Sequence, residues 1–407
     1  MYLRRQLFPT LQTALSQFPA VLVTGPRQSG KTTFLREEFG DRFAYVTFDD
    51  PLTRAFATSD PRGFLDPYRE QPVILDEIQY VPELLPYLKM LIDQNRQRCG
   101  HWLLTGSQQF ALMKNISESL AGRIALLELL PFSQLEYAPA TETLEERLWR
   151  SDYPEPALAP DKRELWLRSY LQTYVERDVR LLHNIQDLRG FELFLGLCAS
   201  RHGQVFNKAA LARDCGVSEP TIKTWGHVLA ASYILYFLPP YHRNYGKRLI
   251  KTPKLYLLDA ALAAWLTRQP SAAAMLAGGM GGALFEGWVV GEAVKVFTLL
   301  GRLPDLFFWR SHDGLEVDLI VLANGRLLPV EIKLTATPTL RHLEPLEKFR
   351  ALAGDEAAES GVLVCRVEQP QPLPQGNLAL PWQRFPAWLR EQLTARTEML
   401  YKNQPTD

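Results

Sequence analysis

In the first 150 residues, short apolar segments alternate with longer segments of mixed composition, which is the pattern of strands separated by helices. Four short apolar runs have the length of buried strands: AVLVT (20–24), FAYVTF (43–48), PVILD (72–76) and HWLLTGS (101–107). The stretches between them have the mixed composition of helices. Strands that alternate with helices of this length predict a parallel sheet covered by helices, so we expect an α/β domain over residues 1–150.

Beyond residue 150 the pattern changes, and prolines mark the boundary. It predicts three further regions: a helical connector (151–190), a winged helix-turn-helix domain (191–270) and a second α/β domain (271–407). The glycine-rich segment 269–282 predicts a linker or flexible loop. The last region begins with one helix, continues with three strand-like runs over 305–334, and then returns to helix.

Composition narrows the class of protein. Of 407 residues, 46% are hydrophobic and 22% are charged, an ordinary globular mixture. Equal numbers of basic and acidic residues, 45 each, exclude a uniformly basic histone-like protein but not a local nucleic-acid site. Four scattered cysteines argue against a disulfide framework or a cysteine-based zinc site. The longest apolar run, 228–241, is too short to span a bilayer, so we expect a cytoplasmic protein without a membrane partner.

A phosphate-binding motif follows the first predicted strand and opens a helix. Residues 25–32 match G-x-x-x-x-G-K-[ST], in which backbone N–H groups cradle phosphates at a helix N-terminus. Lys31 would reach the β- and γ-phosphates of ATP, and the Thr32 hydroxyl would hold Mg²⁺. We expect the nucleotide to contact the whole loop: Gly25, Pro26, Arg27, Gln28, Ser29, Gly30, Lys31, Thr32 and Thr33.

An acidic pair ends the predicted strand 72–76, some forty residues after this loop. Asp76 would orient Mg²⁺, and Glu77 would polarise the attacking water as a catalytic residue. The next strand ends with two hydroxyl groups, Thr105 and Ser107, either of which could sense the γ-phosphate. Of the two we favour Ser107.

Arg123 follows Gly122 after a predicted helix. An arginine placed here could reach the γ-phosphate of a neighbouring subunit and raise the rate of phosphoryl transfer. The alternative is an ordinary surface arginine. Asp49 and Asp50 are better explained by a turn than by a metal site.

Residues 207–241 have the sequence pattern of a helix-turn-helix followed by the strands of a wing. Two acids, Asp214 and Glu219, lie between 201 and 258, against nine basic residues, which gives a local net charge of +7. These are Arg201, Lys208, Arg213, Lys223, Arg243, Lys247, Arg248, Lys251 and Lys254. Such a patch favours DNA as a partner. A winged helix used for protein contacts remains the alternative.

The segment 305–334 predicts a three-stranded meander with hairpin turns at Asp-Gly and Asn-Gly. Glu331 and Lys333 are two residues apart and share one face of a strand, and Asp318 lies on the strand before it. The carboxylates would bind Mg²⁺ or Mn²⁺ through hard oxygen ligands, and Lys333 would act on the attacking water.

Glu286, on the helix before the meander, would complete this metal shell. A glutamate on a helix is thus followed by three strands, which carry an aspartate and then a Glu-x-Lys pair, and by another helix. This order of residues and elements resembles the PD-(D/E)XK nuclease superfamily. Glu316 shares the strand face of Asp318 and is a spare ligand, although we favour a position at the rim.

The motifs GPRQSGKTT, VILDEIQ, LLTGS and LLPFSQLEY resemble AAA+ ATPases of the archaeal, STAND-related type. The segment that begins YLQTYVERDVRLL, with the residues after it, is similar to the C-terminal half that accompanies these ATPases. Ser151 and Asp152 depart from the resemblance, because relatives carry glycines there. The resemblance implies ATP binding and hydrolysis in a homo-oligomer, such as a ring.

Two functions therefore remain open. In the first, ATP turnover drives action on DNA, including metal-dependent cleavage by the C-terminal domain. In the second, the chain is a nucleotide-switched scaffold that binds DNA or protein, and its nuclease-like domain is catalytically inactive.

Overall fold

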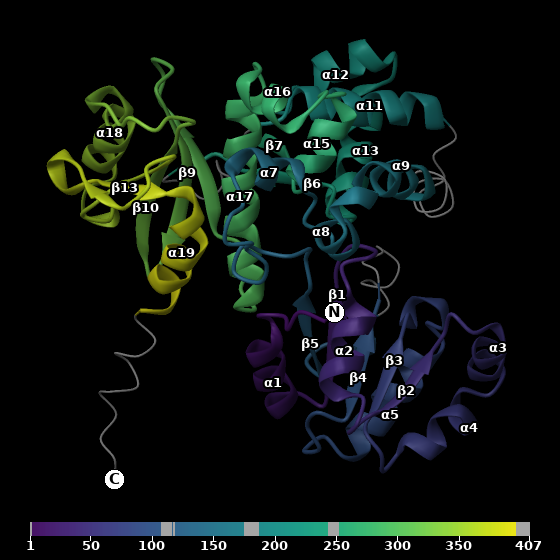
Figure 1. Cartoon of the computed structure of the whole chain (residues 1–407). Coiled ribbons are helices and arrows are strands. Elements are labelled where there is room, and N and C mark those ends of the chain that lie inside the picture. The colour runs from purple at the N-terminus through teal and green to yellow at the C-terminus, as the bar shows by residue number, and fades with distance from the viewer. Residues whose placement is uncertain (1, 107–115, 117–118, 175–186, 243–251, 396–407) are drawn as a thin grey trace, which may run out of the picture.

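The computed structural model describes residues 2–106, 116, 119–174, 187–242 and 252–395 (Figure 1). An N-terminal α/β unit, drawn in purple and blue, lies below a teal, mostly helical middle region. The C-terminal sheet, in green and yellow, lies to one side of both. In the described part of the chain no helix has the length and apolarity needed to cross a membrane.

The N-terminal sheet has five strands in the order β2-β3-β4-β1-β5, and all neighbours are parallel. The strands are β1 (Ala20–Thr24), β2 (Ala44–Thr47), β3 (Val73–Asp76), β4 (Trp102–Thr105) and β5 (Ile124–Glu128). The helices are α1 (Phe8–Gln17), α2 (Lys31–Phe39), α3 (Pro51–Ser59), α4 (Pro61–Leu65) and α5 (Leu84–Gln94). Strands β1, β3 and β4 are buried throughout, as expected where apolar cores cover both faces of a sheet. The parallel α/β fold predicted for this region is confirmed.

The middle region is a bundle of short helices with one hairpin. Its helices are α7 (Leu144–Trp149), α8 (Pro154–Leu158), α9 (Arg163–Thr173), α11 (Leu188–Ser200), α12 (Lys208–Cys215), α13 (Glu219–Ala231), α15 (Ala260–Leu266) and α16 (Ala272–Ala277). Gly216 ends α12 in the left-handed conformation (φ 68°), and the Ser218 hydroxyl caps α13. Strands β6 (Leu235–Leu238) and β7 (Lys254–Leu257) then pair antiparallel.

The segment 269–282 was expected to be a linker or flexible loop, and here the structure differs. The Ser271 hydroxyl caps α16, and Met275 and Leu276 bury their side chains. Helix α16 packs against α7. An alanine-rich helix with a good N-cap therefore forms where the glycines alone suggested a linker.

The C-terminal sheet has the strand order β12-β13-β11-β10-β9-β8. Its strands are β8 (Leu306–Arg310), β9 (Glu316–Ala323), β10 (Arg326–Ile332), β11 (Val362–Cys365), β12 (Gln371–Pro372) and β13 (Leu378–Pro381). Strands β8, β9 and β10 form the predicted antiparallel meander, and β11 joins β10 in parallel. The helices are α17 (Gly281–Leu299), α18 (Glu344–Ala353) and α19 (Phe385–Thr394). This second sheet-containing domain confirms the overall α/β fold class.

Helix α17 is buried along most of its length and stands between the middle region and the C-terminal sheet (Figure 1). Its Glu292 accepts a hydrogen bond from the Ser133 hydroxyl at 2.7 Å and pairs with Arg147 at 3.3 Å. Arg147 also pairs with Asp152 at 2.7 Å, and Lys295 pairs with Asp152 and Glu292. These buried charges join the end of the N-terminal domain to α17.

Candidate functional site

The loop between β1 and α2 has a backbone that requires glycine. Gly25 has φ 142°, and a Cβ atom there would lie 2.2 Å from the carbonyl oxygen of Leu129. Gly30 precedes α2 in the left-handed conformation, with φ 88°. The loop therefore wraps closely around the N-terminus of α2, the arrangement that places backbone N–H groups around a phosphate.

The Lys31 side chain is buried, with 6% of its surface exposed. Its ammonium group donates to the carbonyl oxygens of Gly25, at 3.0 Å, and Pro26, at 2.7 Å. Burial lowers the pKa of Lys31 to about 8, and the nearby Glu77 opposes this shift. The ammonium is thus held inside the loop by neutral carbonyl groups, which an anionic phosphate can replace.

Asp76, at the end of β3, is buried and collects three hydroxyl groups. Thr32 donates to its two carboxylate oxygens at 3.0 and 3.1 Å, and Tyr45 donates to one at 2.8 Å. Thr105, at the end of β4, is the third donor. Burial, with the bond to Asp76, raises the pKa of Tyr45 to about 12. The structure therefore brings the predicted pair Thr32 and Asp76 together beside Lys31.

Glu77 has a left-handed backbone conformation, with φ 59° and ψ 45°. Its N–H group donates to the Thr105 hydroxyl at 3.1 Å, and its carboxylate accepts from the Gln79 amide. A non-glycine residue at positive φ is strained, and such strain is concentrated at functional sites. The turn projects Glu77 from the end of the sheet that also carries the loop.

Ser107, the residue that the sequence favours as the polar sensor, lies outside the described residues. Thr105 was the second choice, and it contacts both Asp76 and the Glu77 backbone. Tyr45 was not anticipated. Its role could be found only from the order of the strands, because β2 pairs with β3 and brings Tyr45 next to the strand that ends in Asp76.

Arg123 lies far from this loop in the same chain. Residue 124 pairs with Ala20 at the start of β1, whereas the loop follows the end of β1. Five strand residues separate the two edges by about 16 Å. Arg123 forms a two-pronged ion pair with Asp93, at 2.6 and 2.9 Å. It cannot contact a nucleotide in the loop of its own chain.

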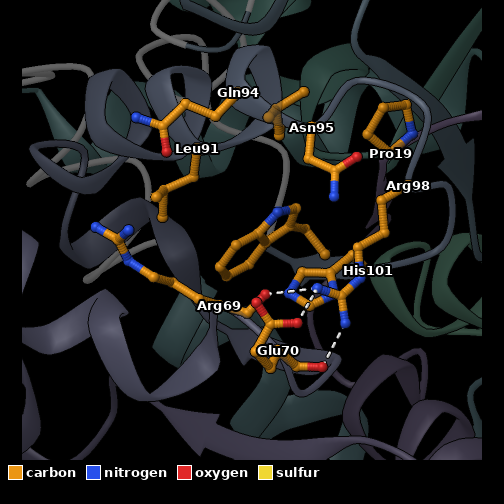
Figure 2. Close-up of a pocket in the computed structure, with 10 residues that line it drawn as sticks. Pro19, Arg69, Glu70, Leu91, Gln94, Asn95, Arg98 and His101 are labelled. Carbon is orange, nitrogen blue, oxygen red and sulfur yellow. Dashed lines mark hydrogen bonds and ion pairs between the residues drawn. The ribbon is translucent and has the colours of Figure 1, made fainter.

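A small cavity of about 130 Å³ lies at the amino-terminal edge of the same sheet (Figure 2). Trp102 and His101 line it from the start of β4, and Arg98 closes one side through an ion pair with Glu70 at 3.0 Å. Because the phosphate-binding loop lies at the opposite edge of the sheet, this cavity is not part of the nucleotide site.

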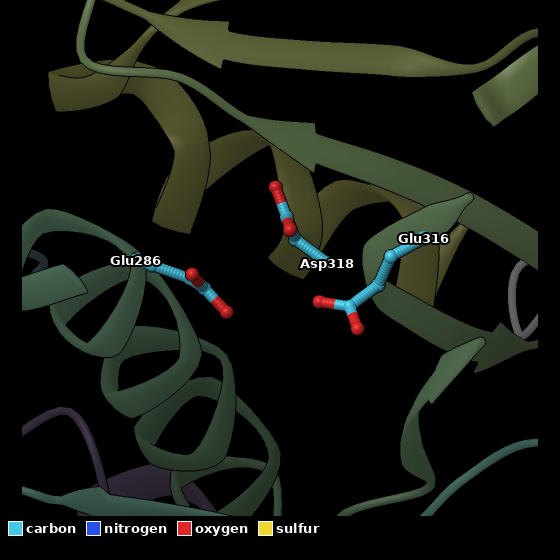
Figure 3. Close-up of side chains that lie close together, drawn as sticks. All are labelled: Glu286, Glu316 and Asp318. Carbon is cyan, nitrogen blue, oxygen red and sulfur yellow. The ribbon is translucent and has the colours of Figure 1, made fainter. Parts of the chain in front are cut away.

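A second constellation lies between α17 and β9. Carboxylate oxygens of Glu286, Glu316 and Asp318 all lie within 4.8 Å of one another (Figure 3). Glu286 and Asp318 were predicted ligands, whereas Glu316 was expected at the rim and instead belongs to the group. Burial, with the nearby Asp318, raises the pKa of Glu286 to about 7.

Glu331 is not a member of this three-carboxylate group. Its carboxylate pairs with Lys333 at 2.6 Å, and burial, with the nearby Asp318, raises the pKa of Glu331 while Lys333 opposes that shift. Lys333 also contacts Asp318 at 2.9 Å. The predicted Glu-x-Lys pair and Asp318 are therefore neighbours, but an ion pair joins them.

A lysine from β7 contacts the carboxylate group. The Lys254 ammonium lies 2.9 Å from Glu286 and also contacts Glu316. Only 4% of Lys254 is exposed, and the Tyr256 hydroxyl donates to the same oxygen of Glu286 at 2.6 Å. The acidic side chains outweigh the effect of burial, so the pKa of Lys254 is raised.

Five of the nine basic residues predicted to form a patch around the helix-turn-helix lie in the described part of the chain, and not all of them are exposed. Lys254 is buried, and Arg201 pairs with Asp214. Four of the nine basic residues lie outside the described residues: Arg243, Lys247, Arg248 and Lys251. Three are exposed on α12 and α13: Lys208, Arg213 and Lys223.

A parallel sheet whose first strand runs into a G-x-x-x-x-G-K-T loop, with an acidic pair ending a nearby strand, defines a P-loop ATPase domain of the AAA type. Residues 17–138 match the family described as AAA domain, which confirms that part of the expectation. Residues 141–273 and 281–385 match two families described as domains of unknown function (DUF8612 and DUF4143).

The chain belongs to the same family as Rv2008c of Mycobacterium tuberculosis and Mb2031c of Mycobacterium bovis, both of which are named uncharacterized proteins. Each is 33% identical over 342 residues, which cover 83% of this chain and 75% of the relative. MJ1544 of Methanocaldococcus jannaschii, also named uncharacterized, is 24% identical over 58% of this chain and 60% of its own.

Among solved structures, the Walker-type ATPase PABY2304 of Pyrococcus abyssi matches with a TM-score of 0.44 and 16% identity. That match covers 65% of this chain and 96% of the other. A variant of RuvB from Thermotoga maritima matches with a TM-score of 0.28 and 19% identity, over 57% of this chain and 88% of the other.

Proposed function

We propose that the AAA domain binds ATP with Mg²⁺ and hydrolyses it. The observation that carries this proposal is the meeting of Lys31, Thr32 and Asp76 at one end of the sheet. The glycine-dependent loop would present its N–H groups to the phosphates. Lys31 would exchange its carbonyl partners for the β- and γ-phosphates, because a charged acceptor binds an ammonium more strongly than a neutral one.

The residues present also fit a magnesium ion. The Thr32 hydroxyl and the Asp76 carboxylate already face each other, and Mg²⁺ prefers such oxygen ligands. When bound, Mg²⁺ offsets the negative charge of the phosphates. Glu77 would orient the attacking water and accept its proton at a carboxylate oxygen, while Thr105 would keep Asp76 and the Glu77 backbone in place.

Lys31→Ala tests nucleotide binding. The substitution removes the buried ammonium, so binding of a fluorescent ATP analogue should be lost. Lys162→Ala is the matched control, because the Lys162 side chain is 59% exposed in the middle region, outside the loop. Equal affinity of Lys31→Ala and Lys162→Ala for the analogue would refute the assignment of the site.

We also propose that the chain assembles as a homo-oligomer, such as a ring, of the archaeal, STAND-related type that its motifs resemble. Arg123 is the candidate residue for such an interface: its distance from the loop of its own chain excludes a role there, which leaves the nucleotide site of another copy or the surface ion pair with Asp93. To serve another copy, Arg123 would leave Asp93.

The middle region, we propose, includes a winged helix that binds duplex DNA. Helices α12 and α13, the capped turn between them and the β6–β7 hairpin have the order of such a module. Three exposed basic residues support a contact with phosphates: Lys208, Arg213 and Lys223. Contact with a protein partner is the alternative.

Replacing these three residues with alanine tests the DNA proposal. The slope of log affinity against log salt should fall by up to about 2.7, because each lost phosphate contact removes about 0.9. ATP affinity should not change, which controls for folding. An unchanged slope would exclude this surface as the DNA site and favour the protein-contact alternative.

For the C-terminal domain the geometry favours the scaffold function over cleavage. The order α17, β8, β9, β10, α18, β11 is the one that the nuclease resemblance implies. However, Lys254 pairs with two of the three grouped carboxylates, and Lys333 pairs with the third and with Glu331. We therefore propose that this domain does not cleave DNA, as the scaffold function requires.

A further inference from the structure

The three-carboxylate group formed by Glu286, Glu316 and Asp318 needs a cation. Its oxygens converge within 4.8 Å, and like charges this close repel one another strongly in a partly buried site. Mg²⁺ or Mn²⁺ would satisfy such a group only by binding its oxygens directly or through water. The identity of the cation is therefore the property that decides what the group does.

Lys254 already supplies a cation to this group. Its ammonium contacts Glu286 and Glu316, the two members that come from different elements, α17 and β9. The PD-(D/E)XK resemblance places a divalent ion between these elements. An ammonium in contact with their carboxylates repels a second cation and occupies the oxygens that the ion would use.

The backbone of Lys254 is fixed on both sides. It pairs with Leu238 in the β6–β7 hairpin and also forms an isolated bridge with Val205. Two residues further along β7, Tyr256 donates to Glu286. The strand thus presents an ammonium and a hydroxyl to the same carboxylate, and its pairing on both sides fixes the backbone from which the ammonium reaches the group.

We propose that Lys254 is the resident cation of this group and excludes divalent metal ions from it while β7 keeps its position. The proposal goes beyond the ATPase function and gives a physical reason for an inactive nuclease-like domain. It also makes the helix-turn-helix region part of the C-terminal site, since β7 belongs to its hairpin. Access for a metal would require β7 to move.

Titration with Mn²⁺ alone, in the absence of nucleotide, tests the proposal. The electron paramagnetic resonance signal of free Mn²⁺ gives the number of bound ions, and the part that Asp318→Asn removes is assigned to the carboxylate group. Wild-type protein and Asp318→Asn should bind equally. Lys254→Met should gain one site at least about tenfold tighter than any binding at the group in wild-type protein, and Lys254→Met with Asp318→Asn should lose that site.

Arg310→Met is the matched control. Arg310 lies 3.7 Å from Glu316 with its side chain 55% exposed, so removing it deletes a nearby cation but leaves Lys254 in place. The Arg310→Met variant should therefore gain no Mn²⁺ site. Wild-type binding that Asp318→Asn abolishes would overturn the proposal, as would a folded Lys254→Met variant without the new site. If Lys254→Met does not fold, Lys254→Gln and the wild-type comparison decide the question.

Discussion

The state of Lys31 gives a prediction that can be worked out from its surroundings. Burial lowers its pKa to about 8 in the nucleotide-free protein, and a bound phosphate should raise this pKa because it stabilises the ammonium. ATP would then bind the protonated form. As pH rises through about 8, the free protein loses that form and the affinity for ATP should fall.

The size of the effect follows from the protonated fraction. With a pKa of about 8, about 76% of Lys31 is charged at pH 7.5 and about 9% at pH 9.0. ATP affinity should therefore fall about eightfold between these values, or about 1.3 kcal/mol. An ordinary lysine, with its pKa near 10.4, would remain charged throughout this range and would produce almost no change.

Equilibrium titration with a fluorescent ATP analogue at constant ionic strength and excess Mg²⁺ measures this change. Circular dichroism at each pH establishes that the protein stays folded. Lys31→Ala should bind weakly at both pH values, with a ratio near one. A wild-type affinity that is the same at pH 7.5 and pH 9.0 would refute the argument.

Three further predictions concern folding and assembly. Gly25→Ala should lower the free energy of unfolding by more than about 1 kcal/mol, measured by chemical denaturation, because its Cβ would meet the Leu129 carbonyl at 2.2 Å; unchanged stability would contradict the loop geometry. Arg147→Met should cost about 3–5 kcal/mol by the same measurement, since it leaves buried carboxylates underpaired; a cost under about 1 kcal/mol would contradict it. Arg123→Ala should retain ATP affinity but lose hydrolysis, and mixing with Glu77→Gln protein should restore part of it; no rescue at any ratio would exclude a role in trans.

Local motifs carried most of what the sequence could predict. The spacing within one strand–turn–helix unit defines the loop from Gly25 to Thr33, and the end of one strand defines the acids Asp76 and Glu77. Local sequence was therefore enough to predict these site residues. Thr105 and Tyr45 depend on which strands are adjacent. The order β2-β3-β4-β1-β5 places both beside Asp76, and no local pattern encodes that order.

Residues that act between regions were the hardest to predict. Lys254 was counted with the basic patch because its sequence neighbours are basic, yet it lies buried against Glu286 and Glu316. Glu292 and Lys295 look like ordinary polar positions of a helix. Their partners come from segments more than 130 residues away, and such pairing follows from the tertiary arrangement alone.

Separating ATP binding from ATP turnover in Glu77→Gln tests the central claim most directly. The variant keeps Lys31, Thr32 and Asp76, so ATP should bind with an affinity within about twofold of wild type. Hydrolysis, measured as ADP formed under single-turnover conditions, should fall by about 10²-fold or more because no carboxylate accepts the proton of water. Glu77→Gln protein that hydrolyses ATP at the wild-type rate would contradict the account.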